Sequence, residues 1–261
     1  MSESSNEIDY TAQEMMAIAA ARALEDYQVC FVGIGAPSRA ANLARATHAP
    51  HLVMVYESGC IGSKPTKLPQ SIGDGDVAET ADALVSASEI FNYWLQSGRI
   101  DIGFLGGAQI DRFGNINTTV IGDYEHPQVR LPGAGGATEI AGSARQTFIL
   151  INQSVRTFVR HLPFRTTVGF GDGPGDRERL GLTGSGPSLV ITNLGLLKPD
   201  PVTCELVLTQ VHFGVDVEEV RNSTGWNLAV SETVTETAPP TTDELTMLRR
   251  LDAGLPIESS P

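Results

Sequence analysis

Three segments of this chain share one pattern, a nearly unbroken apolar run that ends in glycine or in a polar turn. The runs are QVCFVGIG (28–35), HLVMVYE (51–57) and IDIGFLGG (100–107). Strands with one solvated face alternate apolar and polar residues, whereas strands buried on both faces read as continuous apolar runs. The pattern therefore predicts an α/β fold with an open, largely parallel sheet covered by helices.

Helical segments alternate with these runs, as an α/β unit requires. Thr11 and Glu14 form a capping box, which marks the start of a helix over TAQEMMAIAAARALED (11–26). Residues 60–76 are instead dense in Gly, Pro, Ser and Asp, so they predict a long loop, and long loops in compact domains are commonly functional. Further helices are expected after Gly35, at 86–100 and at 242–251, and further strands at 145–153 and 187–197.

Length and charge limit the classes of protein that this chain can be. The 261 residues, 41% of them apolar, can bury a sizeable core, so we expect a single domain over 1–261 with a polar tail from about residue 231. The formal charge of -13 argues against binding to nucleic acid or to an anionic membrane surface. The N-terminus lacks the basic and apolar parts of a signal peptide, and no apolar run reaches about 18 residues, which predicts a cytoplasmic protein.

The cysteines and histidines predict neither a disulfide framework nor a metal site. Cys30, Cys60 and Cys204 are odd in number, widely separated and without CxxC spacing. The five histidines show no spacing typical of metal ligands. We therefore expect no bound metal ion.

Glu57 raises the first question about function, because it directly follows the second apolar run and directly precedes Ser58 and Gly59. Open α/β sheets bind ligands at the carboxyl ends of their strands. A carboxylate at such an end is either a solvated turn residue or a group held out to meet a ligand. GIGAPS (33–38) and GGAQIDRFGNINTT (106–119) follow the other two runs and are expected at the same edge.

Glycines and short polar side chains at this edge are suited to orienting a ligand, and equally suited to capping turns. GIGAPS lacks the full GxGxxG spacing of a dinucleotide site, and a tight turn between strand and helix accounts for its glycines. The candidate substrate-binding residues are Ser58, Gly59, Gly106, Gly107, Gln109, Asn115 and Asn117.

The segment LPGAGGATEI (131–140) concentrates glycine and alanine in one loop. The lack of side chains leaves backbone N–H groups uncovered, and two such donors can stabilise a developing oxyanion. Gly135 and Gly136 are the candidate donors, although a flexible surface loop would have the same composition.

The order of these motifs resembles a known family. The chain is similar to the second (B or β) subunit of the two-subunit class I CoA-transferases, of the glutaconate CoA-transferase and 3-oxoadipate CoA-transferase type. The resemblance extends from about Tyr10 to about Gly225, nearly the whole chain. It is carried by YESGCIG (56–62), LPQSIGDGD (68–76), FLGGAQIDRFGNINTTVIGDYEHPQVRLPGAGGATEIA (104–141) and GPGDRERLGL (173–182).

The resemblance implies the CoA-transferase superfamily fold and a role for each motif. Glu57, in the Glu-Ser-Gly motif, would be the catalytic nucleophile, and Gly133, Gly135, Gly136 and Ala137 would form a glycine-rich oxyanion loop. No permanently bound cofactor is implied, because the substrates would be a coenzyme A thioester and a small mono- or dicarboxylic acid. A separate CoA-transferase α (A) subunit would complete the site.

The proposed chemistry suits the residue types. A glutamate is ionised at neutral pH without a neighbouring base, so its carboxylate can attack a thioester carbonyl and become a glutamyl-CoA thioester, with ping-pong kinetics. Two alternatives stay open: a hydrolase on the same fold, in which water replaces the acceptor acid, and a non-catalytic partner subunit, against which the intact ESG motif argues. The motifs look closer to the 3-oxoadipate enzymes, with succinyl-CoA as donor, than to the glutaconate enzyme.

The substrates of such an enzyme are anionic, whereas this chain is strongly acidic. We expect the α subunit, or a few local cations, to hold the phosphates and carboxylates. Lys64, Lys67 and Arg130, called the cation set below, flank the proposed site in the sequence. Each could equally be a solvated surface charge.

Overall fold

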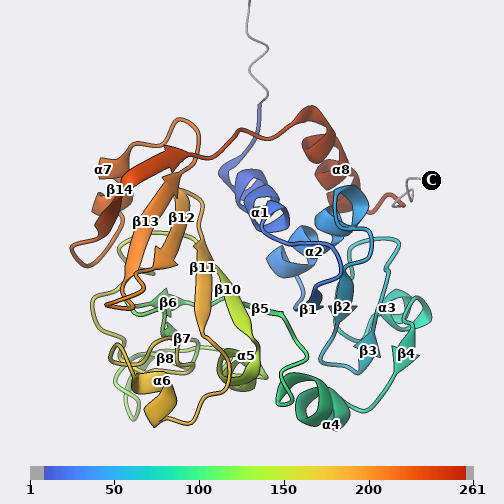
Figure 1. Cartoon of the computed structure of the whole chain (residues 1–261), viewed down its shortest axis with the longest axis horizontal. Helices are drawn as coiled ribbons and strands as arrows, with labels where there is room; N and C mark the ends of the chain where they lie inside the picture. The colour runs from blue at the N-terminus through green and yellow to red at the C-terminus, as the bar shows by residue number, and fades with distance from the viewer. Residues whose placement is uncertain (1–8, 257–261) are drawn as a thin grey trace, which may run out of the picture.

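The computed structural model describes residues 9–256, which are built around one ten-stranded mixed sheet (Figure 1). Its strands are β1 (Val29–Phe31), β2 (Val53–Val55), β3 (Cys60–Ile61), β4 (Ala83–Leu84), β5 (Ile102–Leu105), β10 (Gln146–Leu150), β11 (Pro187–Ile191), β12 (Gly195–Pro199), β13 (Leu206–Val211) and β14 (Ala229–Glu236). The spatial order is β14-β13-β12-β11-β10-β5-β1-β2-β3-β4. The central strands β11, β10, β5, β1 and β2 are mutually parallel, so the expected open, largely parallel sheet is confirmed.

Helices and two small ribbons complete the described fold. The ribbons pair β6 (Gln109–Ile110) with β7 (Ile116–Asn117), and β8 (Val120–Gly122) with β9 (Pro127–Arg130). The helices are α1 (Ala12–Arg22), α2 (Ala36–Thr47), α3 (Gly75–Glu79), α4 (Ala87–Glu89), the π-helix η1 (Ile90–Leu95), α5 (Ala137–Ser143), α6 (Asp176–Arg179), α7 (Val217–Asn222) and α8 (Thr242–Asp252).

Two hydrophobic cores lie on the two faces of the sheet, which explains why the strands read as continuous apolar runs. One core packs α1, α2 and α8 together, as Figure 1 shows. The other lies under η1, α5 and α7. Strand residues alternate between the cores: Cys30 and Met54 face the first, and Phe31 and Val55 face the second.

Local sequence signals set the ends of several helices. The capping box expected at Thr11 is confirmed, because the Glu14 N–H donates to Thr11 Oγ1 at 3.2 Å and the Thr11 N–H donates to Glu14 Oε2 at 2.7 Å. The helix ends earlier than the sequence indicated, at Arg22 rather than 26. The helix expected near 242–251 is also confirmed, as α8.

The C-terminal helix α8 packs on the N-terminal helices. Leu245, Leu248 and Leu251 are each at most 2% exposed, and burying a leucine contributes about 1.5–3 kcal/mol. Surface ion pairs contribute about 0–1 kcal/mol each, so leucine burial is the larger effect. Close packing of the C-terminal helix on the N-terminal helices is expected if the chain forms a single domain, and we propose that it does. Three ion pairs of 2.6 Å join α8 to α1 and α2: Arg22–Glu244, Arg39–Asp252 and Arg249–Glu14.

The sequence misjudged several elements. The predicted loop 60–76 begins with β3 and ends in α3, because Gly59 reverses the chain at φ +107° and Ile61 then pairs with Val55. The predicted strand 187–197 is a hairpin of β11 and β12, turned where Thr192 Oγ1 accepts two backbone N–H bonds. The predicted helix 86–100 is shorter and mostly a π-helix, and β13 and β14 were not foreseen.

Candidate active site

The carboxyl ends of three neighbouring strands form the edge where the candidate residues lie. β5, β1 and β2 are adjacent and parallel, so Gly106, Gly33 and Glu57 emerge at the same edge of the sheet. The expectation that GIGAPS, Glu57 and the glycine pair at 106–107 share one edge is therefore confirmed. Figure 1 shows α4 and α5 in the lower part of the molecule.

A tight turn holds Glu57 and Ser58 at its tip. The Gly59 N–H donates to Tyr56 O at 3.0 Å, and the Tyr56 N–H donates to Cys60 O at 2.9 Å. A β-carbon on Gly59 would lie 1.9 Å from the carbonyl oxygen of Val85, and its φ of +107° is unfavourable for any other residue. Only glycine fits after Ser58, so the turn that presents Glu57 is fixed by sequence.

The strand residue below the turn is fully buried. Tyr56 is 0% exposed, whereas Glu57 is half-buried and Ser58 is exposed. Burial raises the pKa of Tyr56 to about 12, so its phenol stays neutral at pH 7. The carboxylate of Glu57 thus stands at the boundary between a neutral core and solvent.

The glycine loop meets Glu57 directly, although 79 positions separate Glu57 from Gly136 in the sequence. Gly136 is the N-cap of α5. A β-carbon built on it would lie 3.4 Å from Glu57 Oε2 and 2.7 Å from Phe91 Cζ. Any side chain at 136 would therefore fill the space between the glycine loop, the carboxylate and the aromatic ring.

The backbone donors of this loop differ in availability. The Ala137 N–H donates to Ala134 O at 2.9 Å, and the Gly133 N–H donates to Thr118 O at 2.8 Å. Within residues 9–256, no hydrogen bond uses the N–H of Gly135 or of Gly136. Of the four residues that the resemblance assigns to an oxyanion loop, these two therefore keep the donors that a ligand could use.

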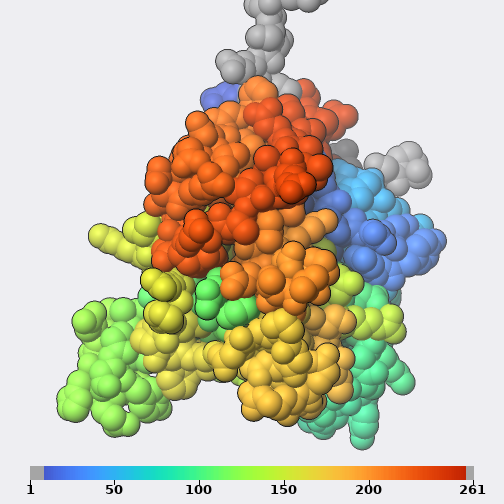
Figure 2. Space-filling model, turned by 60° about the vertical axis from the view of Figure 1, so that its left-hand side comes forward, coloured from blue at the N-terminus to red at the C-terminus, as the bar shows by residue number. Residues whose placement is uncertain are grey.

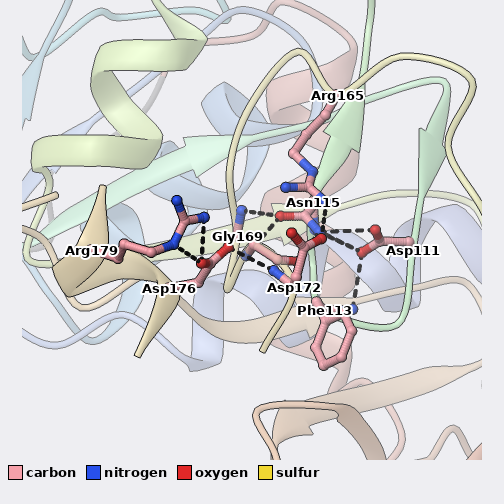
Figure 3. A network of polar contacts seen from close by, with 9 residues as sticks. Asp111, Phe113, Asn115, Arg165, Gly169, Asp172, Asp176 and Arg179 are labelled. Atoms are coloured by element: carbon pink, nitrogen blue, oxygen red, sulfur yellow. Dashed lines mark hydrogen bonds and ion pairs between the residues drawn. The ribbon is translucent and has the colours of Figure 1, made fainter. Parts of the chain in front are cut away.

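Asn115 and Asn117 are structural in this fold. Both are 0% exposed. Asn115 accepts from the N–H groups of Gly169 and Gly171 and donates to Asp111, as Figure 3 shows. Asn117 donates to Gln109 Oε1 and to a backbone carbonyl. Because their polar atoms are already bonded within the protein, we do not carry either asparagine into the proposed substrate site.

The remaining predicted substrate contacts differ in whether they are packed within the protein or exposed to solvent. Gly107 packs against Ile116, whose Cγ2 would lie 2.1 Å from an added β-carbon, and Gln109 is bonded to Asn117. Gly106 is exposed at the end of β5. Gly106 therefore stays a candidate contact, together with Ser58 at the turn.

Two members of the cation set already contact other side chains of the protein. Lys64 Nζ pairs with Asp82 at 2.5 Å, and Arg130 lies over the Tyr124 ring at 4.6 Å from the centroid. Lys67 is exposed. The pairs are on the surface, where such contacts are weak and exchangeable.

Two pockets of several hundred Å³ lie away from Glu57. One of about 480 Å³ lies between α1 and the loop at 212–215, and one of about 440 Å³ is lined by Arg112, Arg160 and Arg165. Glu57 lines neither pocket. The convergence of Glu57, Gly136 and Phe91 is therefore the stronger indication of the reacting centre.

Sequence reasoning missed two residues, Phe91 beside this centre and Arg177 at the far end of α5. Phe91 belongs to the segment 86–100, which the sequence predicted only as a helix, and its ring contacts the position of Gly136. Arg177 lay unremarked in the GPGDRERLGL motif and is buried, with 6% exposure.

Residues 9–256 contain no helix that is long and apolar enough to span a bilayer.

The fold and the site together define a class: an open α/β protein that holds a carboxylate beside a glycine loop at the carboxyl ends of its strands. The family model described as "Coenzyme A transferase" matches residues 13–223. The chain belongs to this coenzyme A transferase family.

Comparison with individual proteins shows which members of this family the chain is similar to. The chain is 59% identical over 244 residues to the B subunit of the 3-oxoadipate CoA-transferase of Pseudomonas knackmussii, covering 94% of each chain. It is 38% identical over 237 residues to the B subunit of the glutaconate CoA-transferase of Acidaminococcus fermentans, covering 88% of each. The crystal structure of the glutaconate coenzyme A-transferase from the same organism superposes with a TM-score of 0.87 at 34% identity, covering 92% of this chain and 94% of that chain.

Proposed function

We propose that this chain is the B subunit of a succinyl-CoA:3-oxoadipate CoA-transferase and that Glu57 is its nucleophile. The observation that carries the proposal is the approach of Gly136 to Glu57, where an added β-carbon would lie 3.4 Å from Glu57 Oε2. The N–H groups of Gly135 and Gly136, which no other group within residues 9–256 uses, support it. The choice of 3-oxoadipate over glutaconate is supported by the higher identity to the 3-oxoadipate relative, 59% against 38%.

The first half-reaction moves CoA onto the enzyme. The Glu57 carboxylate attacks the thioester carbonyl of succinyl-CoA, which breaks the C–S bond and releases the CoA thiolate, leaving a mixed anhydride. The thiolate then attacks the glutamyl carbonyl of that anhydride. Succinate departs as a carboxylate, and a glutamyl-CoA thioester remains on Glu57.

The second half-reaction reverses these steps with the other acid. The carboxylate of 3-oxoadipate attacks the glutamyl thioester, the CoA thiolate leaves, and the thiolate then attacks the 3-oxoadipyl carbonyl of the new anhydride. This attack forms 3-oxoadipyl-CoA and restores the Glu57 carboxylate. No proton, metal ion or redox step is needed to balance the transfer.

Each tetrahedral intermediate of this sequence carries an oxyanion. The N–H groups of Gly135 and Gly136 are the donors we assign to it, and losing one such donor typically raises a barrier by about 2.7–4 kcal/mol. Phe91 packs against the position of Gly136 and limits how far the glycine loop can move.

A second chain is part of the proposal, because both relatives are B subunits by name. Glu57 is half-buried and lines neither of the two pockets described above, as expected for a site completed by a second surface. The β8–β9 ribbon, yellow-green at the lower left of Figure 2, projects from the body with residues 123–126 exposed. It runs into the glycine loop at 131, so we assign it to contact with the A subunit.

Mass spectrometry of the intact chain, co-expressed with its A subunit, tests the proposal. After incubation with succinyl-CoA and then with borohydride or hydroxylamine, we expect one modification, which peptide mapping locates at Glu57. Glu57→Gln should abolish both the modification and turnover, whereas Glu79→Gln, which changes an exposed carboxylate of α3, should affect neither. Turnover without any Glu57 adduct would refute the mechanism, and CoA release to water without an acceptor acid would indicate a hydrolase.

A further inference from the structure

Arg177 is a buried cation whose hydrogen bonds all go to backbone carbonyl oxygens. It is 6% exposed, and burial lowers the pKa of its guanidinium. Burying a charge is costly unless it is fully hydrogen-bonded. The donors reach Gly184 O at 2.7 and 2.9 Å, Gly169 O at 2.7 Å, Val168 O at 3.3 Å, Ala141 O at 3.0 Å and Gly142 O at 3.4 Å.

These acceptors belong to three segments, and one of them is the last turn of α5. The carbonyls of a last helical turn lack partners inside the helix, and a cation there also complements the helix dipole. Arg177 supplies that cation, and the Gly184 N–H adds a bond to Gly142 O at 2.8 Å. The C-terminal end of α5 is therefore fixed by residues 177 and 184.

The loop that contains Val168 and Gly169, whose carbonyl oxygens accept from Arg177, is itself bonded to the β6–β7 ribbon. The Gly169 carbonyl accepts from Arg177. The Gly169 N–H donates to Asn115 Oδ1 at 2.9 Å, as Figure 3 shows. A β-carbon on Gly169 would lie 2.4 Å from the backbone of Gly114, so the loop lies directly against the ribbon. Arg177 thus joins α5 to a second rigid element.

The opposite end of α5 is the candidate active site. The helix has seven residues and is about 10 Å long, so it moves as a rigid rod. Its N-cap is Gly136, which faces Glu57 and Phe91. A shift at the Arg177 end of the rod therefore changes the distance between the backbone donors and the carboxylate.

We propose that Arg177 is a positioning residue for catalysis: by holding the last turn of α5 to the Gly169 loop, it sets the Gly135 and Gly136 N–H groups against Glu57. This inference rests on the proposed function, in which those groups stabilise the oxyanion. Arg177 touches neither Glu57 nor Gly136 and acts only through α5.

Single-turnover kinetics separate positioning from simple folding. Variants of the assembled two-subunit enzyme are mixed with excess succinyl-CoA, and thioester on Glu57 is followed by quenched mass spectrometry. The amplitude reports the folded fraction, whereas the rate constant reports geometry. A displacement of about 1 Å can cost about a hundredfold, so we expect the rate constant of Arg177→Met to fall about ten- to a hundredfold, with a smaller fall for Arg177→Lys. The control Arg179→Met, on the same helix but exposed, should keep the wild-type rate constant.

Each outcome decides between the ideas. A wild-type rate constant with a reduced amplitude in Arg177→Met would assign Arg177 to folding alone and overturn the inference. Absence of thioester in the wild-type enzyme would instead overturn the proposed function, and this inference with it. If Arg177→Met does not assemble with the A subunit, two other variants test the inference. These are Arg177→Lys and Asn115→Ser, of which the second weakens the bond between Asn115 and the Gly169 loop. A wild-type rate constant in both variants would refute positioning.

Discussion

Replacing Gly136 by alanine tests the contact between the glycine loop and Glu57. The backbone of Gly136 has a φ of -80°, so alanine causes no backbone strain there. The new β-carbon would lie 2.7 Å from Phe91 Cζ, and an ordinary contact begins at 3.4 Å, so the surrounding groups must move by about 0.7 Å. The Phe91 ring packs against Phe31, with their centroids 6.0 Å apart, so we expect α5 and Glu57 to take up part of the movement.

The substitution is expected to slow the reaction and also to lower the stability of the fold. A displacement near 1 Å at a reacting centre can reduce a rate about a hundredfold, so we expect about a ten- to hundredfold loss, or about 1.4–2.7 kcal/mol of barrier. Overpacking by one methyl group costs about 1–3 kcal/mol of unfolding free energy, which a domain of this size should tolerate. The assay is the single-turnover rate of thioester formation on Glu57, with thermal unfolding measured in parallel.

A matched control separates the contact from the general effect of removing glycine. Gly75→Ala changes a glycine at the start of α3, where the nearest atom to an added β-carbon is Glu79 Oε1 at 3.8 Å. It should retain wild-type rate and stability. A wild-type rate constant in Gly136→Ala would show that the glycine loop does not approach the reacting carboxylate, and the proposed oxyanion donors would be rejected.

Three further changes probe the turn, the helix contacts and the charges. Gly59→Ala should lower the melting temperature and prevent thioester formation, because the added β-carbon would lie 1.9 Å from the carbonyl oxygen of Val85. The control Gly214→Ala has a positive φ but open space around the added β-carbon, so it should cost only about 1 kcal/mol of unfolding free energy. Equal effects of the two substitutions would contradict the steric reasoning. The hydrogen bond from Arg249 holds the pKa of Glu14 at about 2, below its ordinary value of about 4.3, so this pair stabilises the fold above pH 4.3 and the contribution is lost as pH falls toward 2. Glu14→Gln should therefore cost about 1–2 kcal/mol in urea unfolding at pH 7 and little at pH 2, and a cost independent of pH would refute the linkage. Alanine at all three members of the cation set should raise KM for succinyl-CoA and for the acid, and unchanged KM values would leave anion binding to the A subunit.

Short polar residues at the strand ends show the limit of pattern reading. Asn115 and Ser58 both follow apolar runs and both suit ligand binding by type. The fold buries Asn115, where its amide closes the Gly169 loop onto the ribbon, and leaves Ser58 exposed beside Glu57. An asparagine amide can serve a ligand or the backbone equally well, so only the position of neighbouring chain segments decides.

The sequence by itself determined the features that depend on adjacent residues. Continuous apolar runs indicated a sheet buried on both faces, the Thr11 and Glu14 pair marked a helix start, and Glu57 before Gly59 required a tight turn at a strand end. Each depends on side-chain type and backbone preference over a few positions, which is information the linear chain contains.

The tertiary structure alone decided what meets Glu57 and what holds it. Parallel strands with crossover connections bring together segments that are far apart in sequence, so the approach of Gly136 and Phe91 to the carboxylate follows from topology rather than from spacing. The same applies to Arg177, which by type belongs on the surface and becomes buried only because three separate segments present their carbonyl oxygens to it. Contacts between distant segments depend on how the layers pack, and no local pattern specifies that packing.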